Sequence, residues 1–151
     1  MKSGTINAWV CGFMLASLCL AQQPDAATAL YDKGVQYLGA GEPFKALEAF
    51  DEAVARKPGF ADAHCGRGDA YSKTSRYPLA IAAYSEAIKL QPGHAGALCG
   101  RGFAYYFAEQ YEPARKGFAA AINADVSKAE LIIDFLVGEL ETLGSSLKDS
   151  R

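Results

Sequence analysis

A single spacing, 34 residues, recurs through the middle of the chain and constrains its fold more than any other feature. Gly34, Gly68 and Gly102 follow one another at this interval. The same register aligns Tyr37, Tyr71 and Tyr105; Ala46, Ala80 and Ala114; Phe50, Tyr84 and Phe118; Ala53, Ala87 and Ala121; and Pro58 with Pro92. Columns that repeat without a gap indicate three copies of one structural unit, stacked in series.

Each unit contains two apolar-periodic stretches of about 14 residues, which is the pattern of paired helices. Helices this short are marginal alone, so they must pair and stack to bury their apolar faces. Pro58 and Pro92 end the second helix of a unit, because proline lacks an amide hydrogen. The expected helices are 26–39, 43–56, 60–73, 77–90, 94–107 and 111–124.

The register resembles that of the tetratricopeptide repeat family. Its unit has a bulky residue at position 4, Gly at 8, Tyr at 11, Ala at 20, Phe or Tyr at 24, Ala at 27 and Pro at 32. The matching units are 27–60, 61–94 and 95–128. The departures are Leu30, His64 and Leu98 at position 4, Lys33, Arg67 and Arg101 at position 7, and Val126 in place of the third proline. The resemblance implies an all-α solenoid of three helix-turn-helix units.

A further helix is expected over 128–143, closing a domain of residues 27–143. Ser127-Lys128-Ala129-Glu130 has the spacing of a capping box, and Gly144 is the expected stop before a polar tail, 144–151. This C-terminal capping helix is apolar around most of its circumference, so part of its surface needs a cover. The apolar residues are Leu131, Ile132, Ile133, Phe135, Leu136, Val137, Leu140 and Leu143.

The first 21 residues have the pattern of a signal peptide. Lys2 precedes an uncharged run from Ala8 to Ala21, which is shorter than the roughly 20 residues that span a bilayer. We expect cleavage after Ala21, a linker over 22–26, and a periplasmic or secreted mature protein. A retained membrane anchor and a buried first helix are alternatives. A lipoprotein at Cys19 is a third, although Leu18 stands where such signals have a small residue.

Charge and motifs argue against several other functions. A formal net charge of −2 disfavours nucleic acid as a partner. The chain has no phosphate loop, nucleophile elbow or convergent carboxylate pair, so no catalytic residue or cofactor is expected. His64, Cys65, His94 and Cys99 lack the short spacing of a zinc site, so no metal is expected and both histidines read as core or solvated residues. Cys65 and Cys99 should remain thiols, because neighbouring first helices pack about 8–10 Å apart.

The resemblance implies that positions 2, 5, 6, 9, 12 and 13 of the first helices line a concave, peptide-binding groove. The expected groove residues, extended onto the capping helix, are Tyr31, Val35, Leu38, Cys65, Asp69, Lys73, Cys99, Phe103, Tyr106, Phe107, Ile133, Val137 and Leu140. Gly66, Gly96 and Gly100 are expected to leave its middle deep. The alternative is that the aromatic residues are ordinary core, although the hydroxyls of Tyr31 and Tyr106 favour exposure.

These features together predict a protein-interaction module that binds a polypeptide partner. One subclass of the family grips acidic chaperone tails with Lys at position 5 and Asn at position 9. That clamp is absent, because this chain has Tyr31, Cys65 and Cys99 at position 5 and Val35, Asp69 and Phe103 at position 9. The alternative function is a self-associating structural subunit that dimerises through the capping helix. Arg67 and Arg101 are expected to serve packing rather than anion binding.

Overall fold

A computed structural model describes the backbone of residues 25–149 and the side chains of residues 25–139. The described residues form helices and no strand, which confirms the all-α prediction. The helices are α2 (Ala26–Gly39), α3 (Pro43–Arg56), α4 (Ala61–Lys73), α5 (Tyr77–Leu90), α6 (Ala95–Phe107), α7 (Tyr111–Ala124) and α8 (Lys128–Asp149). None of them is long and apolar enough to cross a membrane. The predicted signal peptide, residues 1–21, lies outside the described part of the chain.

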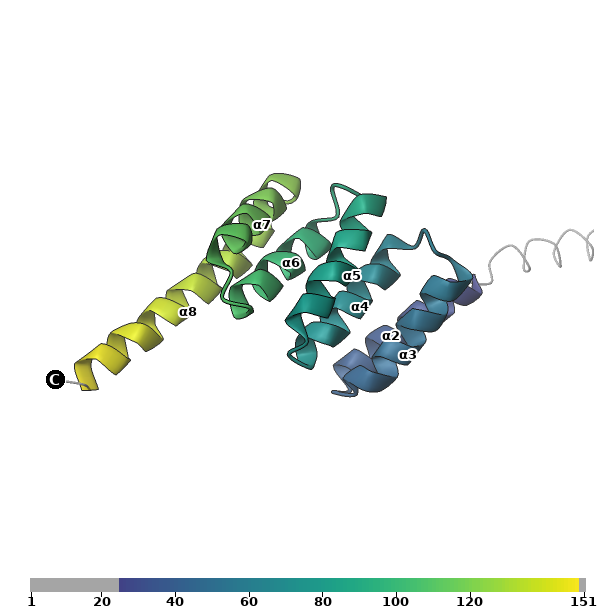
Figure 1. Cartoon of the computed structure of the whole chain (residues 1–151), viewed down its shortest axis with the longest axis horizontal. Coiled ribbons are helices and arrows are strands. Elements are labelled where there is room, and N and C mark those ends of the chain that lie inside the picture. Colours follow the sequence, from purple (N-terminus) through teal and green to yellow (C-terminus); the bar gives the residue numbers. More distant parts are fainter. Residues whose placement is uncertain (1–24, 150–151) are drawn as a thin grey trace, which may run out of the picture.

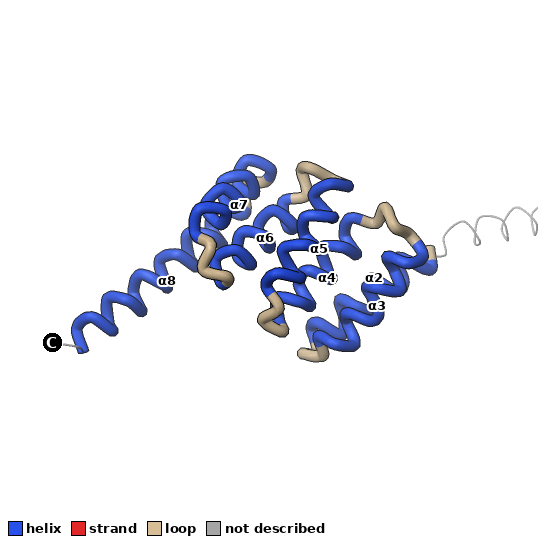
Figure 2. Tube along the Cα trace, in the orientation of Figure 1, coloured by secondary structure: helices blue, strands red, loops and turns tan. Residues whose placement is uncertain are grey.

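The helices pair as α2 with α3, α4 with α5, and α6 with α7, and the pairs stack in chain order (Figure 1). The second helix of each pair also packs against the first helix of the next pair. Short loops join the helices, as the tube drawing shows (Figure 2). This is the predicted solenoid of three helix-turn-helix units followed by one further helix.

Buried aromatic rings at position 24 hold adjacent units together. A Cβ atom added to Gly34 would lie 2.5 Å from the ring of Phe50, and one added to Gly66 would lie 2.6 Å from the same ring. Phe50 is fully buried. The ring therefore fits between the first helix of its own unit and that of the next only because both helices have glycine there.

The same arrangement recurs one unit later around Tyr84, and in part around Phe118. An added Cβ would lie 2.5 Å from the Tyr84 ring at Gly68 and 2.6 Å at Gly100, and one at Gly102 would lie 2.7 Å from Phe118. Glycines 34, 68 and 102 thus lie at repeated helix contacts, as the register predicted. The expectation that Gly66 deepens the groove is corrected, because the ring of Phe50 occupies the space beside it, whereas Gly100, beside Tyr84, does line the trough pocket.

The loops inside the three units share one backbone conformation. Gly41, Ser75 and Glu109, each at position 15 of its unit, have positive φ angles of 75°, 58° and 60°. The following amide donates to the carbonyl of the position 11 tyrosine in every unit, over 2.8–2.9 Å. Only the first unit has glycine here, so the second and third adopt a left-handed conformation with a side chain present.

Arg67 and Arg101, which both stand at position 7 of their units, have structural partners among the described residues. Arg67 Nε lies 2.8 Å from Oδ1 of Asp51, and Arg101 donates to Oγ of Ser85 at 3.3 Å. Each contact ties a first helix to the second helix of the preceding unit. The packing role predicted for both residues agrees with these contacts.

Helix α8 departs from the prediction at its C-terminal end. It starts at Lys128 as expected, where the Ser127 amide donates to Asp125 Oδ1 at 3.0 Å, but it passes through Gly144 and reaches Asp149. Gly144 has helical backbone rather than the left-handed conformation of a stop, and no proline follows it. Most of the predicted polar tail therefore continues the helix. In Figure 1 this end of α8 projects away from the stacked pairs.

Helix α8 also packs less closely than the helices before it: its backbone approaches that of α7, and its Phe135 ring packs against rings of α6. Register explains this difference. The position occupied by Gly66 in α4 and Gly100 in α6 is occupied by Asp134 in α8. A side chain at that position prevents the close approach that a position 24 ring makes in the earlier units. Ile132 is buried, whereas several apolar residues stay exposed: Leu131, Ile133, Leu136 and Val137.

Candidate functional site

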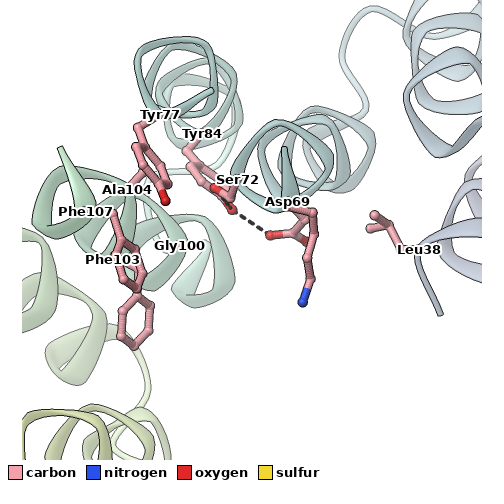
Figure 3. A pocket seen from close by; sticks show the side chains of 10 residues that line it. Leu38, Asp69, Ser72, Tyr77, Tyr84, Gly100, Phe103, Ala104 and Phe107 are labelled. Atoms are coloured by element: carbon pink, nitrogen blue, oxygen red, sulfur yellow. Dashed lines mark hydrogen bonds between the residues drawn. The ribbon is translucent and has the colours of Figure 1, made fainter. Parts of the chain in front are cut away.

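The first helices of the three units, α2, α4 and α6, form one face of the stack, which we call the trough. It contains a pocket of about 560 Å³. Figure 3 shows that Leu38 stands at one side of this pocket, with Asp69 and Ser72 next to it and aromatic residues opposite. The lining residues are Leu38, Asp69, Ser72, Lys73, Tyr77, Tyr84, Gly100, Phe103, Ala104 and Phe107.

The polar side of the pocket is organised around Asp69. The hydroxyl of Tyr84 donates to Oδ1 of Asp69 at 2.7 Å and lies 3.4 Å from Oγ of Ser72 (Figure 3). Because the Tyr84 hydrogen points to Asp69, Ser72 is the donor in the second contact. Burial raises the pKa of Asp69, although the bond from Tyr84 and the charges of Lys73 and His94 act in the opposite direction, and burial raises the pKa of Tyr84. Taken over the whole residue, Asp69 is nevertheless exposed.

The opposite side of the pocket is aromatic. The rings of Tyr77 and Phe107 stack with centroids 5.6 Å apart and planes 19° apart. Phe103 packs edge-on against Phe118 at 5.0 Å and Phe135 at 4.9 Å, so it belongs partly to the core. Phe107, by contrast, is 47% exposed. This wall therefore offers an apolar surface that the protein itself leaves uncovered.

A smaller hollow adjoins the pocket and shares Asp69, Gly100 and Phe103 with it. Its volume is about 210 Å³, and Gly96, Cys99, Lys128 and Leu131 complete its lining. Lys128 and Leu131 belong to the first turn of α8. The start of the capping helix thus contributes to the trough.

Among the groove residues predicted on α2 and α4, three lie outside the pocket lining: Tyr31, Val35 and Cys65. Val35 is 46% exposed on α2. Tyr31 is half-buried, with its ring 5.7 Å from Phe50 and 5.3 Å from Phe60. Burial raises the pKa of Tyr31, and the nearby Asp62, Cys65, Asp69 and Asp32 raise it further.

The two predicted groove cysteines are buried free thiols. Burial raises the pKa of Cys65 far above its ordinary value, and Asp69, Asp62 and Cys99 add to the effect. Burial also raises the pKa of Cys99, against the effect of Lys128. A thiol with a raised pKa is a poor nucleophile, so neither residue has the environment of a reactive cysteine.

For α8, the residues that were predicted to line the trough differ from those that the structure places there. Phe135 is the α8 residue that meets the aromatic wall, with its ring 5.0 Å from Tyr106 and 5.8 Å from Phe107. Ile133 lies instead in a second groove, between α7 and α8, which Tyr106 also lines. Val137 is 47% exposed. The side chain of Leu140 lies outside the described residues.

This second groove, called the α7–α8 groove below, has a volume of about 490 Å³ and an almost entirely apolar lining. It lies where α8 packs against α7 less closely than the earlier helices pack against one another. The hydroxyl of Tyr106 is bonded to Oε2 of Glu139 at 3.2 Å, which fixes this tyrosine at the edge of the groove. The lining residues are Tyr106, Tyr111, Ala114, Arg115, Phe118, Ala119, Ile122, Ile132, Ile133 and Leu136.

Tyr77 and Tyr84, from the second helix α5, were not predicted as site residues. The sequence held a signal for Tyr84, because units one and three have Phe50 and Phe118 in the same column. A tyrosine at a buried ring position brings a hydroxyl that needs a partner, and that partner is a trough residue. For Tyr77, which lies at the start of α5, the register gives no comparable signal.

The histidines act locally. His64 is buried, with Nε2 3.0 Å from the carbonyl oxygen of Pro58. His94 caps α6, because its Nδ1 accepts from the Ala97 amide at 3.0 Å while Nε2 lies 3.0 Å from Oδ1 of Asp62. Within residues 25–139, no group of three or more possible metal ligands comes together.

The family model for the tetratricopeptide repeat matches residues 19–59, 31–95 and 65–130. The chain belongs to the tetratricopeptide repeat family. This assignment agrees with the three stacked helix pairs and with the glycines that lie where they cross. A comparison with curated proteins found no match.

Several solved structures resemble the chain over most of its described length. The second repeat domain of Spaghetti (RPAP3), bound to the HSP90 peptide SRMEEVD, is 24% identical with a TM-score of 0.65, over 67% of this chain and 94% of that one. The TPR2AB domain of yeast Sti1, in complex with HSP90, is 24% identical with a TM-score of 0.70, over 82% and 50%. MamA is 30% identical with a TM-score of 0.62, over 70% of this chain and 57% of that chain.

Proposed function

We propose that this protein is an interaction module, without catalytic activity, that binds a polypeptide segment in the trough. The observation that carries the proposal is the pocket of about 560 Å³, whose aromatic wall includes the exposed Phe107. Binding pockets combine apolar walls with a few placed polar groups, and Asp69 and Ser72 supply those here. Two solved domains of the family are bound to HSP90 or a peptide of it, which supports the same use of this surface.

A selection from random dodecapeptides displayed on phage, made on the purified protein, tests this proposal. Enriched peptides are synthesised and their affinities measured for two matched variants, Phe107→Ser in the trough and Phe44→Ser on α3, where Phe44 is 59% exposed. Phe107→Ser should weaken binding about ten-fold or more, as loss of an aromatic anchor does, whereas Phe44→Ser should not. Failure to enrich any peptide, or equal effects of the two variants, would refute trough binding.

A second candidate function is self-association through α8. It is favoured by the α7–α8 groove and by the exposed apolar residues Leu131, Ile133, Leu136 and Val137. An apolar face of this kind is typical of an interface. Light scattering during size-exclusion chromatography should then give a dimer at micromolar concentration, and Leu136→Glu should return a monomer. A wild-type monomer at that concentration contradicts this candidate.

We further propose that the protein is exported and that residues 1–21 are removed. Lys2, the short uncharged run and Ala21 support this. The intact mass of protein recovered from cells that produce the full chain should correspond to an N-terminus at Gln22. A mass that includes Met1 would contradict cleavage.

A further inference from the structure

The trough pocket has a carboxylate, that of Asp69, which forms no ion pair with a basic side chain of the described residues. Asp69 accepts from Tyr84 through Oδ1, and within residues 25–139 no ion pair involves it. Lys73 lines the same pocket one turn further along α4, but its amine is not within ion-pair distance of Asp69. His94, the other nearby base, lies against Asp62. Within residues 25–139, Asp69 therefore lines the pocket without a direct ion pair, and the charges of Lys73 and His94 act on it only from a greater distance.

Two further carboxylates lie on the same face of the first two units as Asp69. Asp32 and Asp62 are exposed on the same face, and together with Asp69 they raise the pKa of Tyr31. Three carboxylates against Lys73 leave the first two units of the trough with an excess of negative charge. An acidic peptide such as SRMEEVD, which binds the Spaghetti domain, would be repelled here.

The pocket also has the shape and walls that suit a long cationic side chain. Asp69 lies at one side, while the rings of Tyr77, Phe103 and Phe107 form the other (Figure 3). Arginine has an apolar stem that packs on aromatic rings and a planar guanidinium that pairs with a carboxylate and stacks on ring faces. An arginine side chain therefore suits both features of the pocket, the apolar wall and the carboxylate that has no direct ion pair.

We propose that the polypeptide bound in the trough inserts an arginine side chain into this pocket, with its stem against Phe103 and Phe107 and its guanidinium on Asp69. This inference rests on the proposed peptide binding and names the chemistry of the partner. The partner is a basic segment, in contrast to the acidic HSP90 peptide bound by the Spaghetti domain.

The peptides enriched in the selection described above provide the test. They should carry arginine at one position, and replacing that arginine by citrulline, which keeps the shape but loses the charge, should weaken binding about ten-fold or more. With Asp69→Asn, which keeps an acceptor for Tyr84, the same replacement should change the affinity less than about two-fold. Asp134→Asn on exposed α8 is the matched control and should behave as the wild type.

The outcomes separate the two proposals. Enriched peptides that depend on Phe107 but lack a basic residue would refute arginine recognition and leave the peptide-binding function standing. A citrulline effect that persists in Asp69→Asn would show that another group holds the cation, which also overturns the inference. Absence of any enriched peptide would refute both.

Discussion

The hydroxyl of Tyr84 lies 2.7 Å from Oδ1 of Asp69, so a residue of the α4–α5 core is bonded to a residue of the trough. Tyr84 is 2% exposed and packs between two first helices, which makes it a rigid support. Asp69 is therefore held in one orientation before any ligand arrives. Preorganisation of this kind lowers the cost of ordering a side chain on binding.

The raised pKa of Asp69 predicts how its replacement affects stability. Because the folded pKa lies above the ordinary value of 3.8, the folded state holds this proton more tightly than the unfolded state does. The stability contributed by Asp69 is therefore full below that value and is lost as the pH rises through the folded pKa. Asp69→Asn should gain stability relative to the wild type over this rise, by less than about 1 kcal/mol because the carboxylate is open to solvent.

Urea unfolding of both proteins at several pH values from about 3 to 7 measures this difference, since the ordinary pKa lies near the lower end. Asp134→Asn controls for the removal of one negative charge from the surface. A difference between wild type and Asp69→Asn that is constant with pH, or a variant that loses stability relative to the wild type as the pH rises, would contradict the raised pKa. A variant that is more stable but binds basic peptides less tightly would show that Asp69 is kept for binding.

Gly68→Ala should destabilise the fold. Its Cβ would lie 2.5 Å from Cε1 of Tyr84, a ring that neighbouring helices hold in place, and overpacking of this kind typically costs about 1–3 kcal/mol. Gly39→Ala is the matched control, because nothing lies within 4 Å of its Cβ, and alanine there should be neutral or stabilising by up to about 1 kcal/mol. Thermal unfolding distinguishes them, and equal melting temperatures would refute the ring contact.

Substitutions at two loop residues with left-handed backbone should change the stability of the fold in opposite directions. Ser75 has a φ of 58°, which glycine adopts without steric cost, so Ser75→Gly should stabilise the fold by about 0.5–1 kcal/mol. Gly41 has a φ of 75° in the equivalent loop, so Gly41→Ala should destabilise the fold by about 1 kcal/mol. Free energies of unfolding from urea titrations check both values. Changes of the same sign in the two variants would contradict the shared loop geometry.

The sequence predicted the helices of the three units almost to the residue because one register fixes them three times over. Only the starts of α4, at Ala61, and α6, at Ala95, differ, each by one residue. The groove was predicted less completely, since the pocket includes Tyr77 and Tyr84 from α5. Register identifies the first helices as the lining, but it does not show how far a second-helix side chain reaches between them.

The repeat register does not predict the end or the packing of helix α8. Its start follows from local sequence, whereas its end and its separation from α7 depend on packing that no earlier unit repeats. Asp134, at the position of Gly66 and Gly100, was the signal available in the sequence. Its meaning becomes clear only once those glycines are seen to hold the rings of Phe50 and Tyr84.

Because α8 packs less closely than the earlier helices and has no unit beyond it among the described residues, its backbone should open more readily than that of the internal helices. Amide hydrogen exchange, followed by mass spectrometry at low protein concentration, should be at least about 100-fold faster in residues 136–149 than in α4. Equal protection of the two segments would contradict the loose attachment. Protection of α8 that increases with protein concentration, and that Leu136→Glu abolishes, would identify a second copy of the chain as its cover.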